Sequence, residues 1–311
     1  MHLCKHIVGN CELYLADCLE ILPTFAQIDA VVTSPPYDNI RTYEGNSRFD
    51  YHATIKGLFP AIKQGGVVMW NVADATVDGS ETGTSFRQAL AFMDAGFLLH
   101  DTMIYAKDSS SFPCNGRYEN AFEYMFVFSK RKPATFNPLM DKKNANFGTR
   151  IHGTDRQRDG SLIPKKAKPV REFGKRLNWW EINHEQLCSE HPATMPLAMA
   201  RDHILSWTNP GEIVLDPFMG SGTTAVACIK TGRRFIGVEI EPKYFDLACR
   251  RIEEALRQPD MFIELPSPPS VATESNPADL IELTDVQSDR IISDAGEAVQ
   301  FDGAAHSAAG A

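Results

Sequence analysis

The sequence predicts an α/β protein with a mostly parallel sheet and helices on both faces. Short apolar runs, typical of buried strands, alternate with stretches of helical spacing along most of the chain. At 211–231 a strand, a Gly-x-Gly turn and a helix follow one another, and such a turn lets the backbone approach a ligand closely. The 311 residues, of which 43% are hydrophobic, are enough to bury one large core with an insertion.

The first part of the chain supplies several strands of this sheet. We predict strands over 11–15, 28–33, 65–71, 97–105 and 121–130, and a helix over 85–93. Strand, helix and strand in alternation are what a parallel layered sheet requires.

The middle of the chain is polar and basic. From Lys130 to Arg176 there are fourteen Lys and Arg residues against four acids, without sustained periodicity, whereas 259–311 holds one Arg and ten acids. The net charge of −9 therefore conceals a basic block inside a neutral region. Such a block is typical either of a solvated loop or of a surface that neutralises phosphates of nucleic acid.

The last third contains this strand–turn–helix unit, followed by another strand and another helix. The strand at 211–215 ends on Asp216, the next strand at 234–239 ends on Glu239, and an amphipathic helix with Pro242 near its start follows. An acid about 20 residues after the glycine turn is where such folds hold ribose hydroxyls. Neither Gly-Lys-Ser/Thr nor a full Gly-x-Gly-x-x-Gly is present, which disfavours a phosphate-binding loop and a dinucleotide enzyme.

Two motifs carry a family resemblance. Asp216-Pro-Phe-Met-Gly-Ser-Gly-Thr-Thr224 resembles the S-adenosylmethionine motif of the DNA amino-methyltransferases, and Val32-Thr-Ser-Pro-Pro-Tyr37 resembles their catalytic motif. The two prolines fix an extended backbone at the end of a strand, where open α/β sheets place ligands. Pro-Pro-Tyr alone would be typical of a strand-ending turn, but two separate motifs of one family make coincidence improbable.

The resemblance implies a Rossmann-like methyltransferase fold and S-adenosyl-L-methionine as cofactor. It assigns the catalytic role to Ser34, Pro35, Pro36 and Tyr37. It assigns cofactor binding to Asp17, Cys18, His191, Pro192, Asp216, Phe218, Gly220, Ser221, Gly222, Thr223 and Glu239. Thr194 and Met195 depart from the family's His-Pro-x-Gln-Lys-Pro pattern, so no side-chain contact is carried over to them.

The resemblance also implies a domain organisation, in the motif order called the beta group. Residues 1–130 form the catalytic half, 131–185 a target-recognition insert, 186–258 the cofactor-binding half and 259–311 an acidic, disordered tail. The partner is then double-stranded DNA. Its expected contacts are Lys142, Lys143, Arg150, Arg156, Arg158, Lys165, Lys166, Lys168, Arg171, Lys175 and Arg176.

The expected activity is site-specific methylation of the exocyclic amine of a flipped DNA base, of the kind found in restriction–modification systems. Ser-Pro-Pro-Tyr resembles the cytosine-N4 enzymes, whereas adenine-N6 enzymes more often carry Asp-Pro-Pro-Tyr, so cytosine is favoured and adenine is the alternative. A non-catalytic DNA-binding protein and a methyltransferase acting on RNA or a small molecule are the other interpretations.

The composition favours a cytoplasmic enzyme without a membrane anchor, disulfide or metal. No run approaches the ~18 apolar residues of a membrane span, and 1–6 lacks the apolar core of a signal peptide. The seven cysteines include no Cys-x-x-Cys pair. His184, Cys188 and His191 lack a fourth ligand, so no metal site is expected. The oligomeric state stays open, a dimer included.

Overall fold

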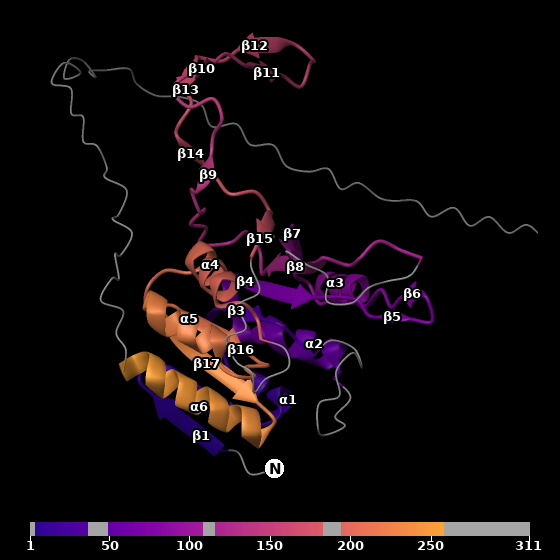
Figure 1. The fold of residues 1–311 in the computed structure, drawn as a ribbon, viewed down its shortest axis with the longest axis vertical. Helices are drawn as coiled ribbons and strands as arrows, with labels where there is room; N and C mark the ends of the chain where they lie inside the picture. Colours follow the sequence, from indigo (N-terminus) through magenta and orange to yellow (C-terminus); the bar gives the residue numbers. More distant parts are fainter. Residues whose placement is uncertain (1–3, 37–48, 108–115, 183–193, 258–311) are drawn as a thin grey trace, which may run out of the picture. The chain divides into compact units, whose positions relative to one another are not determined.

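A computed structural model describes residues 4–36, 49–107, 116–182 and 194–257 (Figure 1). Contacts divide the chain into 1–263 and 264–311, and only the first of these units contains described residues. Tyr37, His191, Pro192 and the tail at 259–311 lie outside the described residues.

A nine-stranded sheet forms the centre of the fold. Its spatial order is β1-β2-β17-β16-β3-β4-β8-β7-β15. In chain order the strands are β1 (Cys4–Val8), β2 (Cys11–Leu15), β3 (Ile28–Thr33), β4 (Ile62–Val72), β7 (Leu98–Ala106), β8 (Phe122–Ser129), β15 (Trp179–Glu181), β16 (Ile213–Asp216) and β17 (Arg234–Glu239). Five neighbouring pairs are parallel and three are antiparallel. The prediction of a mostly parallel sheet is therefore confirmed.

Helices cover both faces of the sheet, as predicted. They are α1 (Cys18–Ile21) with the 3-10 turn η1 (Leu22–Thr24), α2 (Tyr51–Ala61), α3 (Thr84–Asp94), α4 (Leu197–Trp207), α5 (Thr223–Thr231) and α6 (Pro242–Arg257). Val32 packs in one buried cluster with α4, α5 and α6, and its neighbour Val31 packs in a second cluster with α1, α2 and α3. Because successive strand side chains point to opposite faces, one apolar run supplies both cores.

The topology brings both sequence motifs to one edge of the sheet. β16 lies between β3 and β17 and is parallel to both, so Thr33, Asp216 and Glu239 end neighbouring strands at the same edge. The chain leaves β3 towards β4 but leaves β16 towards β17, in opposite directions along the sheet. This reversal is the topological switch point at which open α/β sheets bind ligands.

The basic insert forms short ladders where the sequence predicted no regular structure. β9 (Lys142–Lys143) pairs with β14 (Phe173–Gly174), β10 (Arg150–Ile151) with β13 (Lys168–Pro169), and β11 (Thr154–Arg156) with β12 (Leu162–Pro164). The pairs are nested, so the insert is one interrupted antiparallel arm. No residue from 131 to 179 is buried, so the arm has no hydrophobic core of its own.

The insert is joined to the sheet through its two ends. The Asn137 amide donates to the carbonyls of Leu205 and Thr208 at the end of α4, and Phe136 stacks on Trp207 at 4.9 Å. At the other end β15 pairs in parallel with β7, so the Trp179-Trp180 segment returns the chain to the central sheet.

Local chemistry explains the elements that the sequence pattern did not predict. β1 pairs with β2 across a two-residue turn with Gly9 at φ 56°, a backbone that favours glycine. α2 begins at an Asp50 side chain that accepts from the Ala53 amide. A small hairpin joins β5 (Thr76–Val77) to β6 (Ser80–Glu81). None of the helices within the described ranges is both long and apolar enough to cross a bilayer.

The aromatic core beneath α3 offers a direct test of this packing. Phe92 is fully buried and stacks on Phe128 with ring centroids 4.1 Å apart, whereas Phe86 on the same helix is 52% exposed. Phe92→Ala should lower the free energy of unfolding by about 3–5 kcal/mol because it leaves a cavity. The matched Phe86→Ala should cost about 1 kcal/mol or less. Denaturant titration followed by circular dichroism measures both, and equal losses would contradict the assigned core.

Candidate active site and cofactor pocket

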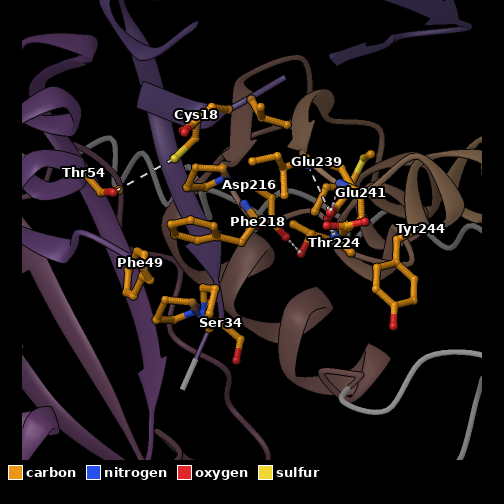
Figure 2. A pocket seen from close by; sticks show the side chains of 18 of the residues that line it. Cys18, Ser34, Phe49, Thr54, Asp216, Phe218, Thr224, Glu239, Glu241 and Tyr244 are labelled. Carbon is orange, nitrogen blue, oxygen red and sulfur yellow. Dashed lines mark hydrogen bonds between the residues drawn. The ribbon is translucent and has the colours of Figure 1, made fainter. Parts of the chain in front are cut away.

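A pocket opens at the switch point, between the ends of β3, β16, β17 and β2 (Figure 2). Among the residues assigned from sequence, its lining includes Asp17, Cys18, Ser34, Pro35, Pro36, Asp216, Phe218, Gly220, Ser221, Thr223 and Glu239. The fold thus brings the two motifs, which are far apart in the chain, into one cavity. Tyr37, His191 and Pro192 lie outside the described residues.

Asp216 ties the two motifs together. Its Oδ1 accepts from the Thr33 hydroxyl at 2.6 Å and its Oδ2 accepts from the Thr224 hydroxyl at 2.8 Å. Oδ1 also accepts from the Phe218 amide at 3.1 Å. Burial raises the pKa of this carboxyl to about 6, against the opposite effect of these three donors. Asp216 therefore positions the strand that precedes Ser34 relative to the helix that follows the glycine turn.

Glu239 is held by the backbone around it. Its Oε2 accepts from the Gly220 amide at 2.8 Å, and its Oε1 accepts from the amides of Ile240 and Glu241 at 3.0 and 2.9 Å. Burial raises the pKa of the carboxyl, and the three backbone donors act in the opposite direction. The Gly220 amide occupies one of the two lone pairs of Oε2, so the other can accept a hydrogen bond from a ligand hydroxyl.

Ser221 and Gly222 attach the glycine turn to α6. Arg251 donates to the Ser221 hydroxyl at 2.8 Å and to its carbonyl at 2.6 Å. Gly222 has φ 80°, and a Cβ there would approach the Ala248 Cβ to 3.1 Å. Close helix packing and a left-handed backbone therefore require this glycine. Gly222 is not among the lining residues of the pocket.

Thr223, the first residue of α5, offers a polar group to a ligand. Its Oγ1 is buried and has no hydrogen-bond partner within the part of the chain that the structure describes. Because a buried hydroxyl without a partner is costly, the group fits a ligand at the N-terminus of α5, where the helix dipole favours a carboxylate.

Apolar side chains form the opposite wall of the pocket. Phe218 meets Phe49 edge to face with ring centroids 5.1 Å apart, and both rings line the cavity (Figure 2). Cys18 lies 4.0 Å from the Thr54 hydroxyl, and burial raises the pKa of its thiol to about 12. The wall is therefore uncharged and suits a flat ring such as adenine.

The charged side chains that line the pocket are all acidic among the described residues. The lining includes five carboxylates and, among the described residues, no Lys or Arg; the acids are Asp17, Asp50, Asp216, Glu239 and Glu241. Such a lining favours a ligand with positive groups and opposes one with phosphates. S-adenosylmethionine carries a sulfonium, an ammonium, a carboxylate, a ribose and an adenine, and the described residues fit each of these groups.

Several lining residues were missed from the sequence. Phe49, Asp50 and Thr54 come from the start of α2, and Glu241 and Tyr244 from the start of α6. No motif marks the α2 residues, because only the tertiary packing of α2 beside β3 brings them to the cavity. Glu241 had a signal, since it is the next acid after the strand-ending Glu239.

Comparison with known proteins agrees with this geometry. A family model described as DNA methylase matches residues 28–250. The orphan methyltransferase M.BamHII of Bacillus amyloliquefaciens is 50% identical over 236 residues, covering 73% of this chain and 89% of that protein. The M1.HpyAVI–SAM complex is 27% identical with a TM-score of 0.52, covering 78% of this chain and 99% of that one. The PvuII cytosine-N4-specific DNA methyltransferase, at 20% identity, shares the fold with a TM-score of 0.57 over 81% of this chain and 93% of its own.

The chain belongs to the DNA methylase family of N4/N6 amino-methyltransferases. It is an S-adenosylmethionine-dependent DNA methyltransferase with the Rossmann-like fold expected from its motifs.

The raised pKa of Asp216 has a measurable consequence. Between its ordinary value of 3.8 and about 6, the folded protein binds a proton that the unfolded chain has released. The contribution of Asp216 to the free energy of unfolding therefore falls as the pH rises through this window and is constant above it. The difference in unfolding free energy between the wild type and Asp216→Asn should follow that slope in denaturant titrations. The control variant Asp94→Asn replaces an exposed acid on α3, and a flat difference for Asp216→Asn would refute the assignment.

Proposed function

We propose that the enzyme methylates the exocyclic amine of a base flipped out of DNA, with the N4 amine of cytosine as its target. The observation that supports this most directly is the position of Ser34, Pro35 and Pro36. These residues continue β3 past Thr33 into the wall of the pocket that Asp216 and Glu239 also line. A nucleophile held at Ser34 would therefore face a methyl donor held by the glycine turn.

The chemistry requires the base to leave the helix. An amine inside a duplex cannot reach a donor in a pocket, and flipping costs a few kcal/mol. Stacking on Tyr37 would return roughly 1–3 kcal/mol of that cost. Both prolines come after the last ladder pair of β3, Thr33 with Trp70, so the Pro35 carbonyl lies outside that ladder and would be available to the base.

Ser34 and the Pro35 carbonyl would accept the two hydrogens of the amine. This draws the nitrogen away from conjugation with the ring and exposes its lone pair. When held by Asp216, Glu239 and the glycine turn, S-adenosylmethionine would supply the methyl group on a sulfonium. The new N–C bond would form as the S–C bond breaks, S-adenosylhomocysteine would be the leaving group, and one amine hydrogen would pass to solvent as a proton. Orientation alone can supply roughly 7–11 kcal/mol to such a step. The acidic lining opposes bound anions and favours the sulfonium, whose charge is the driving force of the transfer.

The basic arm is the proposed DNA-binding element. Most of its Lys and Arg side chains are exposed along the ladders, with Phe147, Leu162 and Ile163 also exposed between them. An arm with exposed cations and no core suits a partner that supplies both phosphates and apolar surface.

Two of the basic residues of the arm, Arg176 and Lys165, also form ion pairs within the protein. Arg176 pairs with Asp141 and with Asp202 of α4, and the Arg176–Asp202 pair at 2.8 Å ties the arm to the fold. Lys165 pairs with Asp155 across the β11–β12 ladder. The phosphate contacts are therefore assigned first to residues that have no such partner within the described part of the chain, Lys142, Lys143 and Lys166 among them.

Charge reversal at these three lysines tests the arm. The triple variant Lys142→Glu, Lys143→Glu and Lys166→Glu should bind duplex DNA more weakly, with a salt dependence reduced by about one unit of slope for each phosphate that is no longer neutralised. The control reverses the same number of exposed cations outside the arm, Lys56 on α2, Arg87 on α3 and Arg234 on β17. Fluorescence anisotropy over a range of salt concentrations gives both slopes. Equal slopes for the two triple variants would show that the arm does not contact phosphates.

The base assignment has its own test. Ser-Pro-Pro-Tyr favours cytosine by family resemblance, and a neutral serine is an adequate acceptor for one amine hydrogen. DNA treated with enzyme and cofactor, then digested to nucleosides, should contain 4-methylcytosine and no 6-methyladenine by mass spectrometry. A product of 6-methyladenine alone would replace cytosine with the adenine alternative and leave the fold and the cofactor unaffected. If the DNA contains neither 4-methylcytosine nor 6-methyladenine, the result would favour the non-catalytic interpretation or an RNA substrate.

A further inference from the structure

Three polar side chains from three neighbouring strands meet at the edge of the sheet beside Ser34, outside the cofactor pocket. Asn71 lies near the end of β4, Glu123 near the start of β8 and Lys107 directly after β7. The Asn71 amide donates to Glu123 Oε2 at 2.6 Å, and the Lys107 ammonium lies 2.6 Å from Glu123 Oε1. One carboxylate thus holds an amide and a lysine in fixed positions. We call these residues the Glu123 trio.

Core packing does not require polar groups at this place. Asn71 is 2% exposed, and the side chains of Glu123 and Lys107 are 12% and 26% exposed. A half-buried ion pair of this kind adds little stability compared with apolar side chains of the same volume. Nearby residues of the same strands, Met103 and Met125, do pack in the apolar core. The trio is therefore better explained by a polar ligand than by the fold.

The trio projects on the same face of the sheet as Ser34. Val32, Met69 and Met125 share the buried cluster that α4 and α5 cover. Side chains two positions apart in a strand lie on one face. Asn71 and Glu123, each two residues nearer the edge than Met69 and Met125, therefore extend that face, and the same alternation takes the chain from Val32 to Ser34.

The strand register brings the trio within reach of a base at Ser34. Thr33 pairs with Trp70, so Ser34 lies next to Asn71 on β4, and Glu123 lies one strand further on β8 (Figure 1). Strand spacing of about 4.8 Å and a rise of about 3.3 Å per residue place the Cα atoms of Ser34 and Glu123 about 12 Å apart. That span accommodates one base ring with a hydrogen bond at each end.

We propose that the Glu123 trio reads the edge of the flipped base, with Lys107 donating to the C2 carbonyl oxygen of cytosine. The proposal rests on the proposed function. With its amine at Ser34, cytosine presents next a ring nitrogen and then the carbonyl oxygen on C2, both acceptors. Adenine presents a ring nitrogen and then a C–H group. An ammonium has three hydrogens, so Lys107 keeps donors for the base while it pairs with Glu123.

The trio would thereby select cytosine without contacting the methyl donor. An ammonium withdrawn from water loses a hydrogen bond when it faces C–H, whereas cytosine satisfies it. Sites that hydrogen-bond a substrate group discriminate strongly against analogues that lack it. Lys107 is then a specificity residue, and Glu123 and Asn71 are positioning residues that aim it.

The test compares two target bases in one sequence. The recognition sequence is mapped by sequencing DNA methylated by the wild type, and duplexes are made with cytosine or adenine at the target position. The wild type should prefer cytosine in kcat/KM, and Lys107→Met should reduce that preference by on the order of ten- to a hundredfold. Its affinity for S-adenosylmethionine should not change, and Lys107→Arg, which keeps a donor, should retain most of the preference. Lys5→Met removes a lysine on β1, at the far edge of the sheet, that pairs with Glu12, and is the matched control.

The outcomes separate the two proposals. A folded Lys107→Met enzyme with the wild-type preference overturns the trio alone. A wild type that prefers adenine overturns the cytosine assignment and the trio with it. If Lys107→Met does not fold, Glu123→Gln, which removes the charge that aims Lys107, is judged by the same ratio.

Discussion

The hydrogen bonds of the Asp216 carboxylate are the constraint on which the rest of the site depends. One oxygen holds Thr33 at the end of β3 and the other holds Thr224 in the first turn of α5. The first contact fixes the strand that leads into Ser34, and the second fixes the helix that follows the glycine turn. Because the group is buried, its removal would leave the Thr33 hydroxyl without this acceptor and the Thr224 hydroxyl with the Val32 carbonyl at 3.4 Å. A single side chain thus fixes the end of β3 relative to the start of α5.

Charge is distributed so that the two ligands do not compete. The cofactor pocket is lined by carboxylates and apolar rings, which suit a cationic methyl donor and oppose phosphates. The cations are gathered instead on the arm at 131–182, which has no buried residue before Trp180. A chain with a net charge of −9 is therefore compatible with DNA, because the sign of the surface differs between its parts.

The switch point explains why one edge of the sheet serves both binding events. The chain leaves β3 towards β4 and leaves β16 towards β17. The loops that follow these two strands therefore run in opposite directions and leave room between them. The proposed cofactor site lies on the β16–β17 side, and the proposed base site extends over β3, β4 and β8 on the other. The Glu123 trio lies at the far end of that second side, which is why it takes no part in the cofactor pocket.

The sequence by itself determined the fold class, the cofactor and the family. Gly220 and Gly222 allow a tight turn, Asp216 and Glu239 end two strands, and Pro35 and Pro36 stop a third, and all of these are local properties. The same locality explains β3, β4, β16 and β17, which were predicted correctly, because each is an apolar run that is largely buried on both faces.

Only the tertiary structure decided which side chains share a site. Phe49 and Asp50 reach the cofactor pocket because α2 packs beside β3, and Arg251 reaches Ser221 because α6 packs on the glycine turn. Asn71, Glu123 and Lys107 meet because β8 runs antiparallel to both β4 and β7. Contacts of this kind join residues many positions apart, and hydrophobic periodicity reports only which face of an element is buried, not which element covers it.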